Sequence, residues 1–172
     1  MGLDITAYRG LKPIKKRFKV LTEEEYEARI DKLYKNNVRF FNMDCFKDRG
    51  LNKEDGYFTY TDEFGFNAGS YGGYNRWRSM LSEIVLGVEA DYVWKHTDQY
   101  NEKPFFYLIH FADNEGNIAG DIKKILQHDF ETTDIGKLLN EYNASQSVKE
   151  DFIERYSKWK KAFTEYDVIS FH

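Results

Sequence analysis

The chain has 172 residues, of which 41% are hydrophobic and 31% are charged. This balance is typical of one globular domain and excludes a disordered tail, a fibre and a multi-domain enzyme. At this length a compact fold buries roughly 70% of the surface that the unfolded chain exposes, so a core is expected without metal or disulfide support. Aromatic residues make up 17% of the chain, which predicts a core built largely from aromatic rings.

The net charge of −4 is unevenly distributed along the chain. Residues 1–22 hold six basic residues and one acidic residue, a charge of +5, which leaves −9 for the remainder. The acidic total disfavours nucleic acid as a partner. The basic stretch Lys12–Lys19 can attract a phosphate-bearing ligand or an acidic partner, although a solvated basic loop is the simpler interpretation.

The expected location is cytoplasmic, with no membrane as a partner. The single cysteine, Cys45, cannot form an internal disulfide, and a lone thiol is typical of a reducing compartment. Met1–Tyr8 is too short an apolar run for a signal peptide, and Asp4 interrupts it. The longest mostly apolar run, Pro104–Ala112, falls far short of the ~20 residues that cross a bilayer.

The first third of the chain predicts a strand, a helix and two further strands. Gly2–Tyr8 alternates apolar and polar residues, the period of a half-buried strand. Thr22 and Glu25 form a capping box that opens a helix through about Lys35. Two short strands are predicted after it, at Val38–Met43 and Tyr57–Thr61.

Helices dominate the predictions for the rest of the chain. From Tyr71 to about Leu86 the apolar residues fall on one helical face, and Gly87 is a plausible stop. Phe105–Phe111 is a candidate strand. Helical spacing predicts further helices over residues 122–130 and 134–142. Ser147 and Glu150 form a second capping box that opens a long helix through Phe163, and Val168–Phe171 closes the chain as a strand.

This order of elements lacks strict strand–helix alternation and predicts an α+β fold. We expect a single domain over residues 1–172. Its mixed or antiparallel sheet should include both terminal strands and pack against three to five helices.

The sequence shows no established nucleotide-binding or metal-binding motif. There is no Walker A loop, no dinucleotide glycine fingerprint and no C-x-x-C pair, and the four histidines lack metal-ligand spacing. We therefore predict no cofactor, no metal and no catalytic residue, and interpret Cys45 as a small buried hydrophobe.

The segment Gly65–Arg78 is the strongest candidate for a binding site, because four glycines lie before or within the first turn of a predicted helix. Free amides and the helix dipole attract an anion there, and glycine allows close backbone approach. Arg78 lies on the flank of the buried face, where a guanidinium needs an anionic partner. The predicted ligand-binding residues are Ser70, Tyr71, Gly73, Tyr74, Arg78, Asp113 and Glu115. In the competing interpretation the glycines form a tight turn, the aromatics are core, and Arg78 pairs with Asp113 or Glu115.

A second candidate lies in Asp113–Gly116, directly after the predicted strand that ends at His110 and Phe111. Two acids near a histidine can carry out general acid–base chemistry. A turn supplied by Asn114 and Gly116 explains the same residues more simply.

Four blocks of the sequence occur in order: MGLDITAY at Met1–Tyr8, AGSYGGYNRWR at Ala68–Arg78, FADNEG at Phe111–Gly116, and YSKWKKAF at Tyr156–Phe163 followed by the terminal Phe171–His172. Together they resemble a family of uncharacterised bacteriophage and prophage proteins. The resemblance implies a phage origin and an infected host cell as the location, but it brings no reaction, cofactor or ligand. The basic stretch Lys12–Lys19 is not a feature of that family.

Small phage accessory proteins often counter host defence, either by binding host proteins or by trapping nucleotide messengers, which is an argument by analogy. With the glycine-rich helix start, it leads us to expect a counter-defence protein that binds and sequesters an anionic, nucleotide-like ligand without turnover. A homo-oligomer is expected, because oligomer interfaces can enclose such a ligand. Two alternatives stay open: an acidic inhibitor of a host defence nuclease or sensor, and a small hydrolase that uses Asp113, Glu115 and His110.

Overall fold

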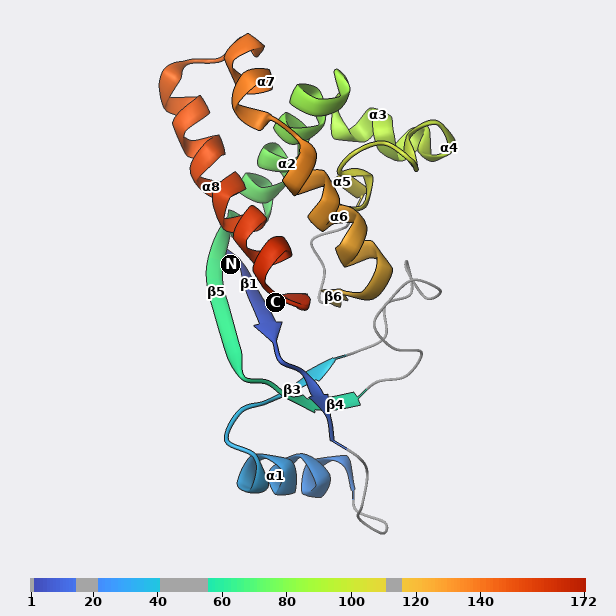
Figure 1. Ribbon diagram of the computed structural model, residues 1–172, viewed down its shortest axis with the longest axis vertical. Helices are drawn as coiled ribbons and strands as arrows, with labels where there is room; N and C mark the ends of the chain where they lie inside the picture. Colours follow the sequence, from blue (N-terminus) through green and yellow to red (C-terminus); the bar gives the residue numbers. More distant parts are fainter. Residues whose placement is uncertain (1, 15–21, 41–55, 111–115) are drawn as a thin grey trace.

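Four strands from both ends and the middle of the chain form one antiparallel sheet. The computed structural model describes residues 2–14, 22–40, 56–110 and 116–172 (Figure 1). The strand order is β5-β1-β7-β6, made of β1 (Gly2–Arg9), β5 (Asp62–Ser70), β6 (Gly116–Ile118) and β7 (Val168–Phe171). Thr6 in β1 lies opposite Gly65 on one side and Ser170 on the other. The two terminal strands are therefore neighbours.

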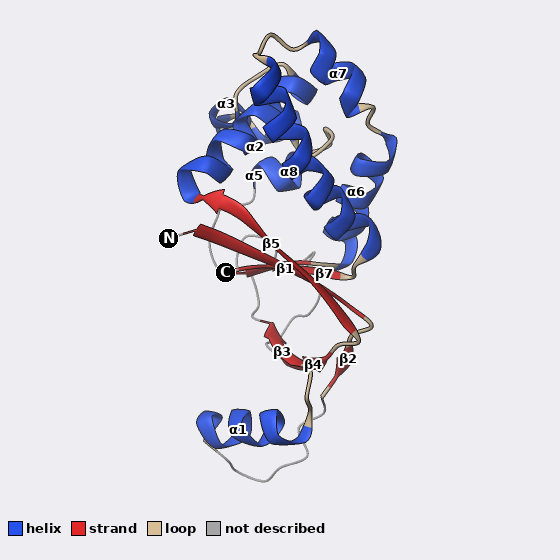
Figure 2. Ribbon diagram, turned by 90° about the vertical axis from the view of Figure 1, so that its left-hand side faces the viewer, coloured by secondary structure: helices blue, strands red, loops and turns tan. Residues whose placement is uncertain are grey.

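A smaller antiparallel sheet continues from the far end of β1. Its order is β2-β4-β3, made of β2 (Lys12–Pro13), β3 (Asn37–Phe40) and β4 (Gly56–Thr59). Tyr8 of β1 packs with Phe40 and Phe58, which joins the two sheets. On the outer side of the small sheet, Tyr26 of α1 (Glu23–Leu33) packs edge-on against Tyr57. Figure 2 shows the resulting order of helices, large sheet, small sheet and α1.

The remaining helices lie on the opposite side of the large sheet (Figure 2). They are α2 (Tyr71–Leu86), α3 (Ala90–Lys95), α4 (Thr97–Tyr100), α5 (Phe106–His110), α6 (Gly120–Thr132), α7 (Ile135–Glu141) and α8 (Gln146–Glu165). Both α2 and α8 contact β1 and β5, and α8 also contacts β7. No helix within residues 2–14, 22–40, 56–110 and 116–172 is long and apolar enough to span a membrane.

Aromatic rings fill the space between α2, α8 and the large sheet, as the composition predicts. Trp77 stacks on Phe152 with ring centroids 5.7 Å apart, and on Trp159 at 5.8 Å. Tyr74 and Phe171 complete this cluster from α2 and from the closing strand. Each large ring removes much apolar surface from water, so this cluster contributes strongly to the stability of the fold.

The α+β prediction, with both terminal strands in an antiparallel sheet, is confirmed. Thr22 and Glu25 form the predicted capping box, since each side chain accepts a hydrogen bond from the other residue's backbone amide. The helix predicted at Tyr71–Leu86 has those bounds, and Gly87 ends it with a left-handed backbone at φ +74°. Residues 41–43 of one predicted strand, Cys45, most of the basic stretch, and Asp113 and Glu115 lie outside the described residues.

The predicted strand at Phe105–Phe111 is wrong in its described part, because Phe106–His110 is the helix α5. Phe106, Tyr107, Leu108 and Ile109 are all buried. A run of residues buried on every side has no hydrophobic period, so a strand and a short buried helix cannot be distinguished from the sequence.

Two further predictions are corrected around the long elements. No strand was predicted at Asp62–Ser70, which forms β5; its Phe64, Phe66 and Ala68 alternate with more exposed residues. The second capping box is wrong, since α8 starts after Ser145 and no side chain caps it. The short helices α3 and α4 were not predicted.

Candidate functional site

A pocket of about 390 Å³ lies between the first turns of α2 and the first turns of α8. Gly73 lies beside Arg155, and the Trp77 indole nitrogen donates to the Phe152 carbonyl oxygen at 3.4 Å, so the two helices run in opposite directions. We call this the α2–α8 pocket. It is lined by Gly73, Arg76, Trp77, Met80, Ser147, Val148, Asp151, Phe152 and Arg155.

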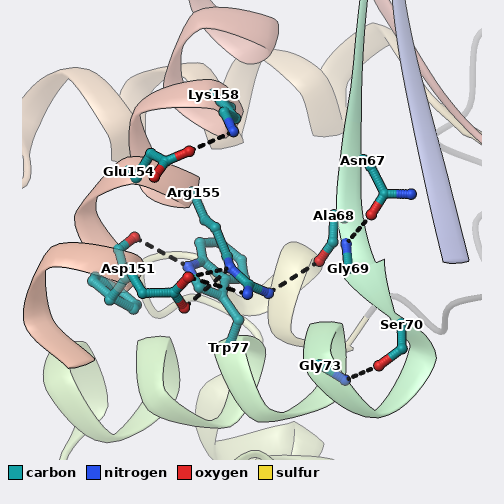
Figure 3. A network of polar contacts seen from close by, with 11 residues as sticks. Asn67, Ala68, Gly69, Ser70, Gly73, Trp77, Asp151, Glu154, Arg155 and Lys158 are labelled. Carbon is teal, nitrogen blue, oxygen red and sulfur yellow. Dashed lines mark hydrogen bonds and ion pairs between the residues drawn. The ribbon is translucent and has the colours of Figure 1, made fainter. Parts of the chain in front are cut away.

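The glycines at the start of α2 make room for an arginine from α8. A Cβ atom on Gly69 would lie 2.9 Å from Nη1 of Arg155, and one on Gly73 would lie 3.7 Å from the same atom. Gly69 also has a φ of +101°, which L side chains rarely adopt. Ser70 caps α2 by accepting the Gly73 amide at 3.1 Å. The glycine-rich segment therefore forms a seat for the Arg155 guanidinium (Figure 3).

Arg155 is fixed on two sides. Its Nε and Nη2 donate to Asp151 Oδ1 at 3.3 and 3.2 Å, and its Nη1 donates to the Ala68 carbonyl oxygen at 3.3 Å (Figure 3). A guanidinium has five N–H donors. Within the described part of the chain these bonds engage three of them, and the other two have no hydrogen-bond partner there. Because the side chain is already held in place, an anion that binds here orders little additional structure.

The charges lining the pocket favour an anion. Arg76 is exposed, and it makes no hydrogen bond or ion pair with any residue that the structure describes. Arg76 and Arg155 together outweigh Asp151, so the lining carries one net positive charge. Arginine also presents planar donors that match phosphate and carboxylate oxygens.

The rest of the lining is apolar except for Ser147. Trp77 and Phe152 form the floor with stacked rings, and both are buried in the core beneath. Met80 and Val148 form the wall at the end away from Arg155, and 45% of Val148 is exposed to solvent. An apolar wall beside two arginines suits a ligand that joins an anionic group to a flat ring.

The predicted site residues fall in three places. Ser70, Tyr71 and Gly73 lie at the start of α2, and Gly73 lines the α2–α8 pocket. The Ser70 hydroxyl oxygen accepts the capping hydrogen bond from the Gly73 amide, and Tyr71 is 38% exposed. Asp113 and Glu115 lie outside the described residues, so the structure does not place them relative to the pocket.

Tyr74 and Arg78 lie on the interior side of α2 and do not line the pocket. Only 3% of Arg78 is exposed, and its guanidinium lies 5.1 Å from the Tyr74 ring centroid and 4.8 Å from that of Trp94. Its Nη2 donates to Asn75 Oδ1 at 2.5 Å. Burial, and after it the charge of Arg78, lowers the pKa of His110. Arg78 thus sits in the core among aromatic rings, a cation–π arrangement.

The sequence reasoning missed Arg76, Asp151 and Arg155. Asp151 and Arg155 stand four residues apart on α8, the ordinary spacing of a surface ion pair, and Glu154 and Lys158 repeat it one turn later. The spacing of charges alone does not distinguish a pair that faces a pocket from one that faces solvent. The apolar stripe Val148–Phe152 beside the pair is the signal that could have singled it out.

Among the residues that the structure describes, no three His, Cys, Asp or Glu side chains gather closely enough to hold a metal ion. Comparisons with known proteins found no matching family model, no matching curated protein and no matching solved structure. The pocket itself therefore carries the functional argument.

Proposed function

We propose that this protein binds a small anionic, nucleotide-like ligand in the α2–α8 pocket and holds it without turnover. The observation that carries the proposal is the Arg155 guanidinium, seated against Gly69 and Gly73 and held by Asp151 and Ala68. With Arg76 it lines a pocket that also has an apolar wall, formed by Trp77, Phe152, Met80 and Val148. Phosphate recognition needs such donors, and a base needs such a wall.

Binding without turnover is supported by the state of the acidic group in the pocket. Asp151 is the acidic residue of the lining, and its Oδ1 accepts hydrogen bonds from two nitrogens of Arg155. Among the described residues that line the pocket there is no second acid and no histidine with which it could form an acid–base pair. The pocket thus favours holding a ligand over reacting with it.

The biological part of the proposal rests on the sequence resemblance to phage proteins. In an infected bacterial cell, a binder of nucleotide-like anions would sequester a messenger on which host defence depends. This step is an argument by analogy.

The test is calorimetric titration and thermal unfolding of the purified protein against linear and cyclic nucleotides. Ligand at ~100 times its dissociation constant should add ~2.7 kcal/mol to the free energy of unfolding, visible as a rise of several degrees in Tm. Replacing Arg76 by alanine should weaken binding about tenfold or more, because a charge-assisted contact is lost. Chromatography of the ligand after incubation should recover it unchanged.

Lys160→Ala is the matched control, since it removes one positive charge from an exposed position of α8 outside the pocket. Equal losses in the two variants would show a general charge effect and contradict the site. If no nucleotide shifts Tm, the proposal fails, and affinity capture from host lysate would test the alternative of a protein partner.

A further inference from the structure

The α2–α8 pocket has the dimensions of one mononucleotide. Its volume of about 390 Å³ is near the lower end of the range of ~300–1,000 Å³ for small-molecule sites. Along α2 the lining runs from Gly73 to Met80, which is roughly 10 Å at 1.5 Å per residue. A single nucleoside with one phosphate fills that length, whereas the second half of a dinucleotide would lie outside the two helices.

The two ends of the pocket differ in chemistry. Gly73 and the Arg155 guanidinium form one end. Because α2 and α8 run in opposite directions, Met80 and Val148 meet at the other end, where the Ser147 hydroxyl is the polar group beside them. A ligand that suits both ends is elongated, with its anionic group and its ring at opposite ends.

Asp151 limits how much negative charge the pocket accepts. It lies between Arg155 and Val148 on α8, and its carboxylate offsets one of the two arginines. A second phosphate placed toward the middle of the pocket would be repelled by this carboxylate. A sugar hydroxyl there would instead donate to it, since a carboxylate accepts about four hydrogen bonds and Arg155 does not use them all.

Building on the proposed function, we infer that the ligand is a nucleoside monophosphate. Its phosphate contacts Arg76 and Arg155, its sugar hydroxyls face Asp151, and its base lies against Met80 and Val148. A linear 5′-monophosphate keeps both ribose hydroxyls and a 3′,5′-cyclic monophosphate keeps the 2′-hydroxyl, so each retains a donor for Asp151.

The first experiment compares ligands of different size on the unmodified protein. Calorimetric titrations use AMP, GMP, CMP, UMP and 3′,5′-cyclic AMP, with cyclic di-AMP and inorganic phosphate as the contrasts. At least one mononucleotide should bind tenfold or more tightly than both contrasts. Cyclic di-AMP binding as tightly as the best mononucleotide would overturn the inference and leave the proposed function standing. If inorganic phosphate binds as tightly as the best mononucleotide, the base does not contribute to binding and the inference is overturned. If none of them binds, the proposed function and the inference fall together.

The second experiment separates the two ends of the pocket. Val148→Thr keeps the volume of the side chain and removes apolar contact from the ring end, so the affinity for the best mononucleotide should fall roughly fourfold. Ser157→Ala, on an exposed position of α8 outside the pocket, should leave it unchanged. An unchanged affinity in Val148→Thr, beside a loss in Arg76→Ala, would show an anion site without the inferred base contact.

Discussion

At the scale of single residues, Gly69 matters both for its backbone conformation and for the space that it leaves beside Arg155. Its φ of +101° excludes most side chains, and its missing Cβ leaves space for Nη1 of Arg155. The nearby atom is the tip of a flexible side chain, so a methyl group here would displace the guanidinium. The bond from Arg155 to the Ala68 carbonyl would then be lost.

Gly69→Ala is expected to lower the free energy of unfolding by about 1–2 kcal/mol, through backbone strain, and also to weaken ligand binding. Gly87→Ala is the matched control. Its φ is +74°, but a Cβ there meets nothing within 4 Å, so it should show the strain without the loss of binding. Urea unfolding and calorimetric titration of both variants measure the two effects. Equal ligand affinities in the two variants would contradict the role given to Gly69.

At the scale of elements, α6 fixes the start of α5 through one buried carboxylate. Asp129 of α6 accepts the backbone amide of Phe105 at 2.8 Å, and Phe105 has a φ of +60°, which is unusual for an aromatic residue. Both residues are buried. Without this acceptor, a buried amide in a strained conformation would have no partner at this position.

Asp129→Ala should therefore lower the free energy of unfolding by about 1–3 kcal/mol in urea titrations. Asp129→Asn keeps an acceptor oxygen and should cost less. If both variants lose the same stability, the hydrogen bond to Phe105 is not what makes Asp129 important.

The titration of Asp129 should make the stability of the wild type depend on pH in a way that the variants do not share. Burial raises the pKa of Asp129 from 3.8, and the hydrogen bond from Phe105 opposes this rise. The folded chain therefore binds the proton at pH values where the unfolded chain has lost it. The contribution of Asp129 to the free energy of unfolding should fall as pH rises from about 4 through the raised pKa, then level off. The difference between wild type and Asp129→Asn, measured across pH, should show this slope.

At the scale of the whole molecule, the last strand is central to the fold. The strand β7 lies between β1 and β6, and the amides of Asp4 and His172 each donate to the other residue's carbonyl oxygen. Phe171 points into the aromatic cluster, where it meets Tyr74 and Trp159. The closing residues thus join the sheet to the two helices that form the pocket.

Phe171→Ala should cost about 3–5 kcal/mol of unfolding free energy, because it leaves a cavity at the centre of this cluster. Tyr71→Ala, which removes a ring that is 38% exposed, is the comparison and should cost far less. Equilibrium unfolding in urea measures both. A small effect of Phe171→Ala would mean that the sheet and the helices are joined elsewhere.

The sequence by itself determined the features that depend on neighbouring residues. The capping box at Thr22, the bounds of α2 and the alternation in β1 follow from local periodicity and capping, so they were predictable. The α+β class followed from the order of these elements. The glycine-rich segment was predicted to be a binding site and stays a prediction; its Gly73 lines the α2–α8 pocket, and part of it is the strand β5.

Only the tertiary structure decided what that segment accommodates. Arg155 reaches the Ala68 carbonyl across 87 positions of sequence, and no local pattern encodes that approach. Arg78 looked like the ligand-binding arginine from its helical position, but the aromatic rings of Tyr74 and Trp94 enclose it in the core. Helical spacing places a residue on a face of its own helix. The pocket depends instead on which face of α8 is turned toward α2 when both helices pack on the sheet. That choice is made by burial of the aromatic cluster, which involves the whole chain at once.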